Sequence, residues 1–392
     1  MNAPTAPPPA ALSFLLAASC GLIVANLYYA QPLAGPIGAA LGLSPGATGL
    51  IVTLTQIGYG AGLLALVPLG DLMENRKLVL GLIGLASLGL IGAAASVSPA
   101  MFLASALLLG LGSVAAQVLV PYAAHLAPDA IRGRVVGNVM SGLMLGIMLA
   151  RPVASMVAEF SSWRVMFWLS VAAMAGLALI LARALPPRTP SSTLRYRDLL
   201  LSMVGLLRSS AVLRRRSLYH ACLFGAFSLF WTTVPLYLAS PAYGLSQGGI
   251  ALFALAGVAG AVATPLAGRI ADRGWIRPAT RAAMAIAAGS FLLAHCVPHT
   301  TLGLGLLTLA AIGVDFGSAA NLTLGQRAIF ALGAAQRARL NGLYMAIFFA
   351  GGAVGSALGG WAFAQGGWAL ASWIGTALPV LAFAYQMTEA RG

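Results

Sequence analysis

Charge is the property that this 392-residue sequence lacks most. Only 8% of its residues are charged, and Asp and Glu together number 8. The sequence contains no G-x-x-x-x-G-K-[ST] nucleotide-binding loop and no H-E-x-x-H zinc motif. No polar stretch is long enough to form a soluble domain for nucleotide chemistry. We therefore predict a protein that is not an enzyme and that uses neither a cofactor nor a metal ion.

Cysteine is also scarce. The three residues, Cys20, Cys222 and Cys296, lie far apart in apolar runs, so their spacing fits neither a disulfide framework nor a metal site. We interpret them as small buried thiols. The first ten residues, MNAPTAPPPA, lack the basic segment of a signal peptide. We therefore expect the first apolar run to be a retained helix.

Hydrophobic residues are abundant instead. They make up 60% of the chain, and the mean hydropathy is +0.91. A soluble protein would need far more charged surface to cover such a core. The apolar runs have the length that crosses a lipid bilayer, which predicts an all-α membrane protein. The twelve predicted spans are residues 11–34, 46–70, 78–97, 100–123, 135–158, 164–184, 217–239, 246–268, 279–298, 301–323, 340–362 and 367–387.

The formal net charge is +14, which on its own would fit a nucleic-acid-binding protein. The distribution of the charge argues against that function. Of the 22 Lys and Arg residues, 20 lie on one side of the predicted membrane, and the connections after spans 1, 3, 7, 9 and 11 contain none. Basic connections stay in the cytoplasm. We therefore predict a multi-pass protein with both termini cytoplasmic, and the Arg-rich, Lys-poor usage favours a bacterial inner membrane.

A short charged turn occurs twice. Its first copy is Gly70–Lys77, GDLMENRK, and its second is Gly268–Gly274, GRIADRG. Glu74 and Asp272 are 198 residues apart, and half of the chain is 196 residues. This spacing predicts two similar halves in tandem, as in many secondary transporters. The predicted domains are an N-terminal six-helix half (1–184), a cytoplasmic linker (185–216) and a C-terminal six-helix half (217–392).

The second part of the linker has two interpretations. It ends in Arg214, Arg215 and Arg216, so it could form a basic amphipathic helix on the membrane surface. A solvated connection fits the same composition.

The repeated turn resembles the signature of the major facilitator superfamily, which reads approximately G-x-x-x-D-R-x-G-R-R between spans 2 and 3 and is echoed between spans 8 and 9. The second copy matches through Gly268, Asp272 and Arg273. The first departs from the signature, with Glu74 in place of the Asp and Asn75 in place of the Arg. The resemblance covers essentially the whole chain. It implies twelve transmembrane helices in two six-helix halves that work by alternating access.

Shorter pieces resemble bacterial drug–proton antiporter-like and sugar-efflux-like permeases. They are NLYYAQP (26–32), VTLTQIGYG (52–60), WRVMFWL (163–169) and ARLNGLYM (338–345). In span 5, Gly142, Gly146 and Pro152 resemble a glycine–proline signature of exporters, although Arg151 stands where a small residue is usual. Span 4 lacks the intramembrane Arg of many drug–proton antiporters, so that coupling scheme does not transfer.

The resemblance implies a monomeric secondary transporter in a lipid bilayer, with protons and a small organic molecule as its partners. We predict efflux of that molecule in exchange for protons. Proton symport or facilitated uptake is the alternative within the same class. A transport-inactive membrane sensor that uses its basic face is the alternative from another class.

Two ionisable residues lie well inside predicted spans, where a charge is costly. Asp315 lies about thirteen residues into span 10, roughly 20 Å from its outer end. A carboxyl group away from water is a candidate for taking and releasing a proton near neutral pH. Arg151 cannot release its proton, so its candidate roles are to pair with Asp315 or Glu159, or to hold an anionic substrate. A static interhelical contact for Asp315, and snorkelling towards the interface for Arg151, are the structural alternatives.

Polar and aromatic residues of spans 1, 2, 4 and 7 are the predicted lining of a substrate cavity. Each has an alternative role in helix packing or in the interfacial aromatic belt. A mixed amide and aromatic lining predicts a moderately apolar or neutral substrate. The candidates are Asn26, Tyr28, Tyr29, Gln31, Gln56, Tyr59, Gln117, Tyr122, Phe227 and Trp231.

The repeated turn is also the predicted gate. An acid at a helix C-terminus opposes the helix dipole, so Asp71 needs a basic partner such as Arg132 or Arg134. Such a pair would form in one state of the transporter and break in the other, and a static ion pair of little energy is the alternative. The predicted gating residues are Gly70, Asp71, Glu74, Arg76, Lys77, Arg134, Gly268, Asp272 and Arg273.

Overall fold

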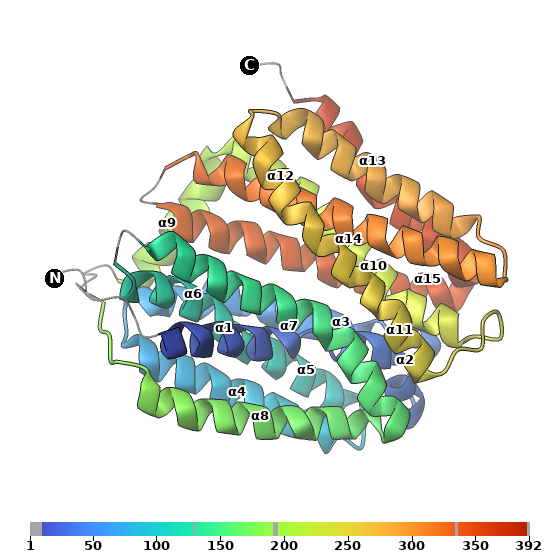
Figure 1. The fold of residues 1–392 in the computed structure, drawn as a ribbon, viewed down its shortest axis with the longest axis horizontal. Coiled ribbons are helices and arrows are strands. Elements are labelled where there is room, and N and C mark those ends of the chain that lie inside the picture. The colour runs from blue at the N-terminus through green and yellow to red at the C-terminus, as the bar shows by residue number, and fades with distance from the viewer. Residues whose placement is uncertain (1–9, 129–130, 191–194, 334–335, 390–392) are drawn as a thin grey trace.

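The computed structural model describes residues 10–128, 131–190, 195–333 and 336–389, apart from the side chains of 259–261. All regular elements within these residues are helices, and they form two bundles that lie one above the other in Figure 1. The lower bundle contains α1 (Ala10–Ala25), α2 (Ala30–Leu41), α3 (Leu50–Ala65), α4 (Asn75–Ala94), α5 (Pro99–Ser113), α6 (Ala115–Leu126), α7 (Arg132–Phe160) and α8 (Trp163–Ala184), with the short 3₁₀ helices η1 (Pro45–Ala47) and η2 (Val67–Asp71). The upper bundle contains α10 (Ala211–Ala239), α11 (Gln247–Ala254), η3 (Leu255–Val262), α12 (Ala263–Asp272), α13 (Ile276–His295), α14 (Thr301–Phe330) and α15 (Arg337–Met387).

Ten helical stretches in the described chain are long and apolar enough to cross a membrane. The longest, α15, corresponds to predicted spans 11 and 12, because the chain turns at Gly366 and Gly367, where the helical dihedral angles are lost. The ninth predicted span corresponds to α13, which is not among the ten and contains Arg277 and Arg281 in its first two turns. The predicted fold, twelve helices in two six-helix halves, is confirmed.

The two ends of the bundle differ in charge. We call the end formed by the connections after predicted spans 2, 4, 6, 8 and 10 the basic end, because these connections contain Lys and Arg. We call the opposite end the neutral end. The basic end lies at the left in Figure 1.

Three spans are interrupted near their middle. In span 1, residues Asn26–Tyr29 form a turn between α1 and α2. In span 4, Val114 separates α5 from α6, and in span 8 the 3₁₀ helix η3 separates α11 from α12. Interrupted helices in membranes are tolerated where the freed backbone faces protein or a cavity, and they often build binding sites in transporters.

Spans 1 and 5 pack through glycines. A Cβ atom added to Gly142 would lie 2.3 Å from the carbonyl oxygen of Ala17, and one added to Gly146 would lie 2.2 Å from that of Gly21. Real side chains do not approach a backbone so closely, so the contact requires glycine at both positions. Small residues allow helices to approach closely in lipid, where burial of apolar surface does not drive association.

Spans 7 and 11 repeat this contact in the upper half. A Cβ atom on Gly351 would lie 2.2 Å from the carbonyl oxygen of Ala221, and one on Gly355 would lie 2.0 Å from that of Gly225. The same pair of helix positions is thus joined by the same chemistry in both halves. The exporter-like glycines of span 5 are therefore half of a repeated packing contact.

The predicted linker contains a helix, α9 (Tyr196–Ser209). Its buried residues Leu199 and Met203 face the protein, and Met203 packs with Leu340 and Tyr344 at the basic end of the upper half. The opposite face exposes Leu201, with Arg197 one turn before it. The contact of this face with a membrane surface stays a prediction.

Substitution in the glycine contact tests the packing. We expect Gly146→Ala to destabilise the protein by about 1–3 kcal/mol, because the added methyl group must displace the backbone of span 1. Gly176→Ala is the matched control, since nothing lies within 4 Å of its added Cβ. The control should be neutral or slightly stabilising, as Ala favours a helix more than Gly. Melting temperatures of the purified variants in detergent measure the difference, and equal values would contradict the packing.

Candidate functional site

One ion pair joins the two halves in the middle of the bundle. Arg151 projects from α7 of the lower half, and Asp315 projects from α14 of the upper half. Arg151 Nη1 lies 4.0 Å from Asp315 Oδ2, and the two residues are only 4% and 7% exposed. Asp315 is the fifteenth of the thirty residues of α14, so it lies near the middle of that helix. Of the sequence-derived alternatives for Arg151, the structure shows pairing with Asp315.

Trp231 fixes the orientation of Asp315. The indole Nε1–H of Trp231, in α10, donates a hydrogen bond of 2.6 Å to Asp315 Oδ1. The second carboxylate oxygen, Oδ2, is the one that faces Arg151. A separation of 4.0 Å is too long for a hydrogen bond, so the pair is held by charge alone.

Aromatic rings surround the guanidinium group of Arg151. Its Cζ atom lies 4.0 Å from the ring centre of Trp231, 5.1 Å from that of Phe227 and 5.9 Å from that of Tyr28. Tyr28 belongs to the turn that interrupts span 1. Cation–π contacts in a desolvated site stabilise a charge by about 2 kcal/mol. They offset part of the cost of burying Arg151.

Several buried polar atoms near the interface of the halves have no partner. Arg151 Nε and Nη1 donate no hydrogen bond within the described residues. Both amide atoms of Gln31, in span 1, and Oε1 of Gln56, in span 2, likewise have no partner there. Buried polar groups in proteins are almost always hydrogen-bonded, and unsatisfied ones need an explanation. Water or a ligand can supply the missing bonds.

The space beside Arg151 is small and apolar. It is too small for a water molecule, and its walls come from spans 1, 5, 7 and 8. The lining residues are Pro32, Arg151, Trp231, Val234, Pro235, Leu238, Ile250, Phe253 and Ala254.

Gly257, in η3, closes the other side of the pair. A Cβ atom at this position would lie 2.7 Å from Asp315 Oδ2 and 3.4 Å from Arg151 Nη1. The absence of a side chain thus lets span 8 approach the ion pair. Gly257 has no distinguishing signal in the sequence, because it is one of 47 glycines and only its neighbours in space set it apart.

The predicted substrate residues fall into two groups. Phe227 and Trp231 line the ion pair, while Gln56 donates a hydrogen bond of 2.8 Å from Nε2 to Ser228 Oγ across the halves. Tyr59 also crosses the interface, with its ring centre 4.5 Å from that of Phe349.

The other predicted substrate residues do not reach the ion pair through any contact in the described chain. Asn26 is hydrogen-bonded to Ser170 and to Met174 of α8, inside the lower half. Gln117 donates to the Tyr59 hydroxyl at 3.0 Å, inside the lower half. The Tyr122 hydroxyl donates to the carbonyl of Pro186 at the basic end. Tyr29 is buried at the start of α2.

At the neutral end, the halves are in direct contact. Glu159 Oε2, beyond Arg151 on α7, accepts a hydrogen bond of 2.7 Å from the backbone N–H of Gly248, in the first turn of α11. A carboxylate at this position also interacts favourably with the helix dipole. Thr53 and Ser356 share a hydrogen bond of 2.8 Å between spans 2 and 11. From the sequence, Glu159 is predicted only as a candidate partner of Arg151, whereas in the structure it binds the backbone of α11.

The first predicted gating turn is bound within its own half. Asn75 Nδ2 donates to the Gly70 carbonyl at 2.6 Å, and Glu74 accepts a hydrogen bond from the Arg76 backbone at the start of α4. The Arg76 side chain donates to the carbonyl of Ala182, at the end of α8. Asp71 is exposed.

No ion pair joins Asp71 to Arg134 within the described residues, and Arg134 is exposed as well. The second turn differs from the first. Asp272 pairs with Arg327 of α14 at 3.3 Å, but both side chains are more than half exposed, so the pair contributes at most about 1 kcal/mol. Gly268 lies in α12 and Arg273 directly after it. A gating role for these residues stays a prediction.

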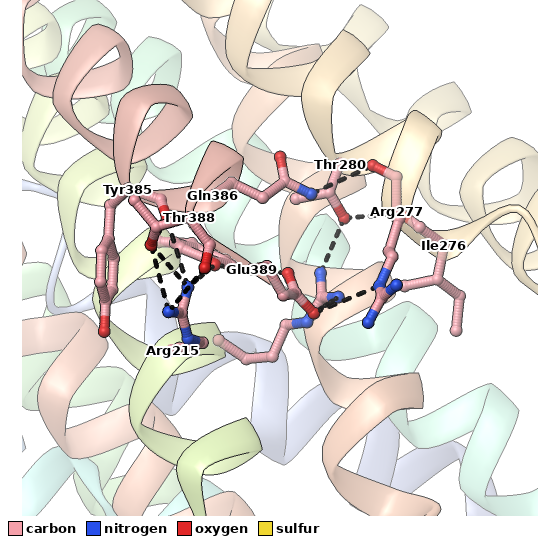
Figure 2. A network of polar contacts seen from close by, with 10 residues as sticks. Arg215, Ile276, Arg277, Thr280, Tyr385, Gln386, Thr388 and Glu389 are labelled. Atoms are coloured by element: carbon pink, nitrogen blue, oxygen red, sulfur yellow. Dashed lines mark hydrogen bonds and ion pairs between the residues drawn. The ribbon is translucent and has the colours of Figure 1, made fainter. Parts of the chain in front are cut away.

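The densest network of charged contacts lies away from the ion pair, at the basic end of the upper half (Figure 2). Glu389 Oε1 lies 3.4 Å from both Arg216 Nη2 and Arg277 Nε. Arg216 also donates to Thr280 Oγ1 at 3.0 Å. The network joins α10, α13 and the end of α15, so it ties together helices of one half only.

Removing one member of the ion pair at a time gives an asymmetric prediction. Arg151→Gln leaves an acid that can take a proton, whereas Asp315→Asn leaves a guanidinium that cannot lose one. An unpaired buried charge destabilises by up to about 3–5 kcal/mol, so Asp315→Asn should lower the melting temperature more than Arg151→Gln. The double variant should melt above Asp315→Asn. Equal melting temperatures for the two single variants would contradict a buried charge pair.

Known proteins resemble this chain over almost its whole length. A model of the Major Facilitator Superfamily matches residues 13–336. The uncharacterized transporter YgaY of Escherichia coli O157:H7 is 40% identical over 364 residues, which cover 90% of each chain. The probable transporter SCO4007 of Streptomyces coelicolor is 34% identical over 353 residues, covering 89% of this chain and 80% of its own.

Solved structures show the same fold at low identity. The nucleoside transporter NupG has a TM-score of 0.78 at 15% identity, covering 97% of this chain and 99% of its own. A D-xylose-proton symporter has a TM-score of 0.74 at 17% identity, with 97% and 98% covered. A bacterial homolog of the human lysosomal transporter Spinster, in an inward-facing and occupied conformation, has a TM-score of 0.77 at 16% identity, with 96% of each chain covered. From the family match and the curated relatives we conclude that this chain is a multi-pass membrane transporter that belongs to the Major Facilitator Superfamily.

Proposed function

We propose that this transporter couples the movement of a small organic molecule to protons, with Asp315 as the proton carrier. The observation behind the proposal is the buried ion pair between Arg151 and Asp315, whose members come from different halves. A buried charge pair is a poor source of stability, so a functional role is the better reason for its presence. Intramembrane acids with a basic partner are typical of proton pathways in transporters.

The ion pair links the proton to the arrangement of the halves. While Asp315 is ionised, its attraction to Arg151 holds α14 against α7. When Asp315 takes a proton, this attraction ends and the halves can separate at the neutral end, where Glu159 and Thr53 now join them. The glycine contact of spans 1 and 5 lies within the lower half, and that of spans 7 and 11 lies within the upper half. Each half can therefore move as a unit. This is the basis of the alternating access that we propose.

The distribution of basic residues supports an orientation in a bacterial inner membrane. The basic end would face the cytoplasm, and both chain termini with it. The neutral end, where the halves are in contact, would then face outwards. In this arrangement the transporter, acting as a monomer, would bind and release its substrate on the cytoplasmic side.

Two directions of coupling are candidates. Efflux in exchange for protons is supported by the resemblance of span 5 to exporters, of which Gly142 and Gly146 are part. Uptake together with protons is supported by Arg151, which keeps a positive charge in the site whenever Asp315 is protonated. The two directions differ in the sign of the pH change that the substrate causes.

The first experiment measures this pH change. Purified protein is reconstituted into sealed proteoliposomes that contain a pH-sensitive dye, and a panel of organic compounds is added outside. With wild-type protein, a substrate should acidify the interior by symport or alkalinise it by antiport. We expect Asp315→Asn to reduce the proton movement at least tenfold, because an amide cannot carry the proton.

Folding of Asp315→Asn is checked by size-exclusion chromatography and by counterflow of labelled substrate, which needs no proton movement. Substrate flux without proton movement in wild type would refute the proposal and indicate a uniporter. The absence of flux for every compound would instead favour the sensor.

The closure of the neutral end gives a separate prediction. We expect Glu159→Ala to weaken the contact between α7 and α11 by about 1 kcal/mol, since it removes a hydrogen bond and a favourable charge at the helix N-terminus. The population open at the neutral end should then rise about fivefold. Spin labels at Ser161 and Pro241 report the separation of the two halves there. Asp198→Ala, which removes an exposed acid of α9, is the control and should leave the distances unchanged.

A further inference from the structure

The guanidinium group of Arg151 is held in the protein with an incomplete set of partners. Its Nε and Nη1 atoms form no hydrogen bond, and its nearest acid is 4.0 Å away. The Cζ atom of Arg151 lies over the rings of Trp231 and Phe227. These rings do not replace the oxygen atoms that usually accept hydrogen bonds from a guanidinium group. The void next to it is too small for a water molecule. Hydrogen bonds to a charged group are the strongest in proteins, so their absence here needs a reason.

Asp315 cannot supply the missing bonds from its present position. Its Oδ1 atom already accepts the hydrogen bond from Trp231, and that bond fixes the plane of the carboxylate. The groups facing Asp315 that carry or can gain a charge are Arg151 and Tyr28, within the described residues. A second acid that could complete the coordination of Arg151 is therefore not present in this part of the chain.

The charge of the site decides what can bind. With Asp315 ionised, the site is neutral. With Asp315 protonated and nothing else bound, it contains one unpaired guanidinium, and such a charge in a medium of low dielectric constant is strongly disfavoured. A proton therefore enters the site at low energy only together with a negative charge.

From these contacts we infer that Arg151 binds the carboxylate of a small organic monoanion and that this anion travels with the proton on Asp315. The inference rests on the proposed function, because it needs Asp315 to carry the proton. One guanidinium group balances one negative charge, so a monoanion fits better than a phosphate ester. The unpaired amide atoms of Gln31 and Gln56 are candidates to bind hydroxyl groups of the same molecule.

The remaining walls describe the rest of the substrate. Val234, Leu238 and Phe253 line the void beside Arg151, and the ring of Trp231 covers it. These side chains are apolar, so after the two halves part and the void widens they would contact an aromatic or aliphatic carbon skeleton. The expectation of a moderately apolar substrate is thus kept, while its neutral charge is replaced by a single negative one.

The transport step balances in charge and in protons. A proton from water on one side adds to the Asp315 carboxylate, and the anion binds to Arg151 as the two side chains part. Both leave on the other side, where Asp315 releases its proton to water and pairs with Arg151 again. Anion and proton therefore move in the same direction and carry no net charge across the membrane. This favours symport over the antiport expected from the resemblance to exporters.

The experiment compares acids with their uncharged amides in the dye-filled proteoliposomes. The probe pairs are lactate and lactamide, 4-hydroxybenzoate and 4-hydroxybenzamide, and glucuronate and glucuronamide. Protein-free vesicles measure the passive entry of each acid, which is subtracted. We expect at least one acid to acidify the interior at least tenfold faster than its amide. The rate should not change when valinomycin and potassium impose a membrane potential.

Variants of Arg151 test the binding role. Arg151→Gln should reduce acid-driven acidification at least tenfold, whereas Arg151→Lys, which keeps the charge, should retain a larger part of it. The double variant Arg151→Gln/Asp315→Asn, which contains no buried charge at the site, serves to show that loss of activity is not loss of folding. Its melting temperature and elution volume should be close to those of wild type.

The possible failures are distinguishable. If an amide or a cation moves protons in wild type but not in Asp315→Asn, the proposed function holds and the inference is overturned. The inference is also overturned if Arg151→Gln transports the acid normally, if the rate follows the membrane potential, or if no acid exceeds its amide. If a compound is transported with no proton movement at all, the proposed function itself fails.

Discussion

The structure depends on one costly interaction, the charge pair between Arg151 and Asp315 in the middle of the bundle. Burying two charges is expensive, and a separation of 4.0 Å without a direct hydrogen bond recovers only part of that energy. Trp231 contributes twice, since it donates to Asp315 and lies under Arg151. Because Gly257 has no side chain, the backbone of span 8 can lie close to the ion pair. The surrounding residues therefore stabilise a contact that is not stable by itself.

Glycine and polar contacts join helices both within each half and across the halves. Within each half, glycines bring paired helices into backbone contact, as Gly146 does in one half and Gly355 in the other. In the upper half, Glu389 adds charged contacts among three helices at the basic end. Between the halves, the neutral end is joined by hydrogen bonds from Glu159 and Thr53 and by a further glycine contact, since a Cβ atom on Gly49 of span 2 would lie 2.2 Å from the carbonyl oxygen of Ser356 of span 11. Rocking of the halves as two rigid bodies would separate this contact of spans 2 and 11, while the contacts inside each half stay in place.

The fold and the ion pair were predictable from sequence because both have a strong physical signature. Long apolar runs and a turn repeated at half-length indicate the number of helices and their division into two halves. Asp315 stood out because an acid inside an apolar span is rare and costly. The direction in which the side chains of Asn26 and Tyr122 point was not predictable. An amide or a phenol in a helix can form hydrogen bonds to a neighbouring helix as well as to a substrate. The role of Gly257 depends on an approach of span 8 that no local pattern encodes.

The cost of an isolated charge in a medium of low dielectric constant links the charge of the site to the direction in which proton and substrate move. Antiport of a neutral molecule requires a state in which the proton is bound alone, and in that state Arg151 would be an isolated charge between the two halves. Three aromatic rings reduce this penalty but do not remove it, because cation–π contacts are weaker than a full ion pair. An anion removes it completely. An exporter built on the same fold would avoid the problem with a small residue before Pro152, which is the residue type usual in the signature that this span resembles. Under the proposed symport, Arg151 is therefore the residue that distinguishes this chain from the exporters whose signature span 5 resembles.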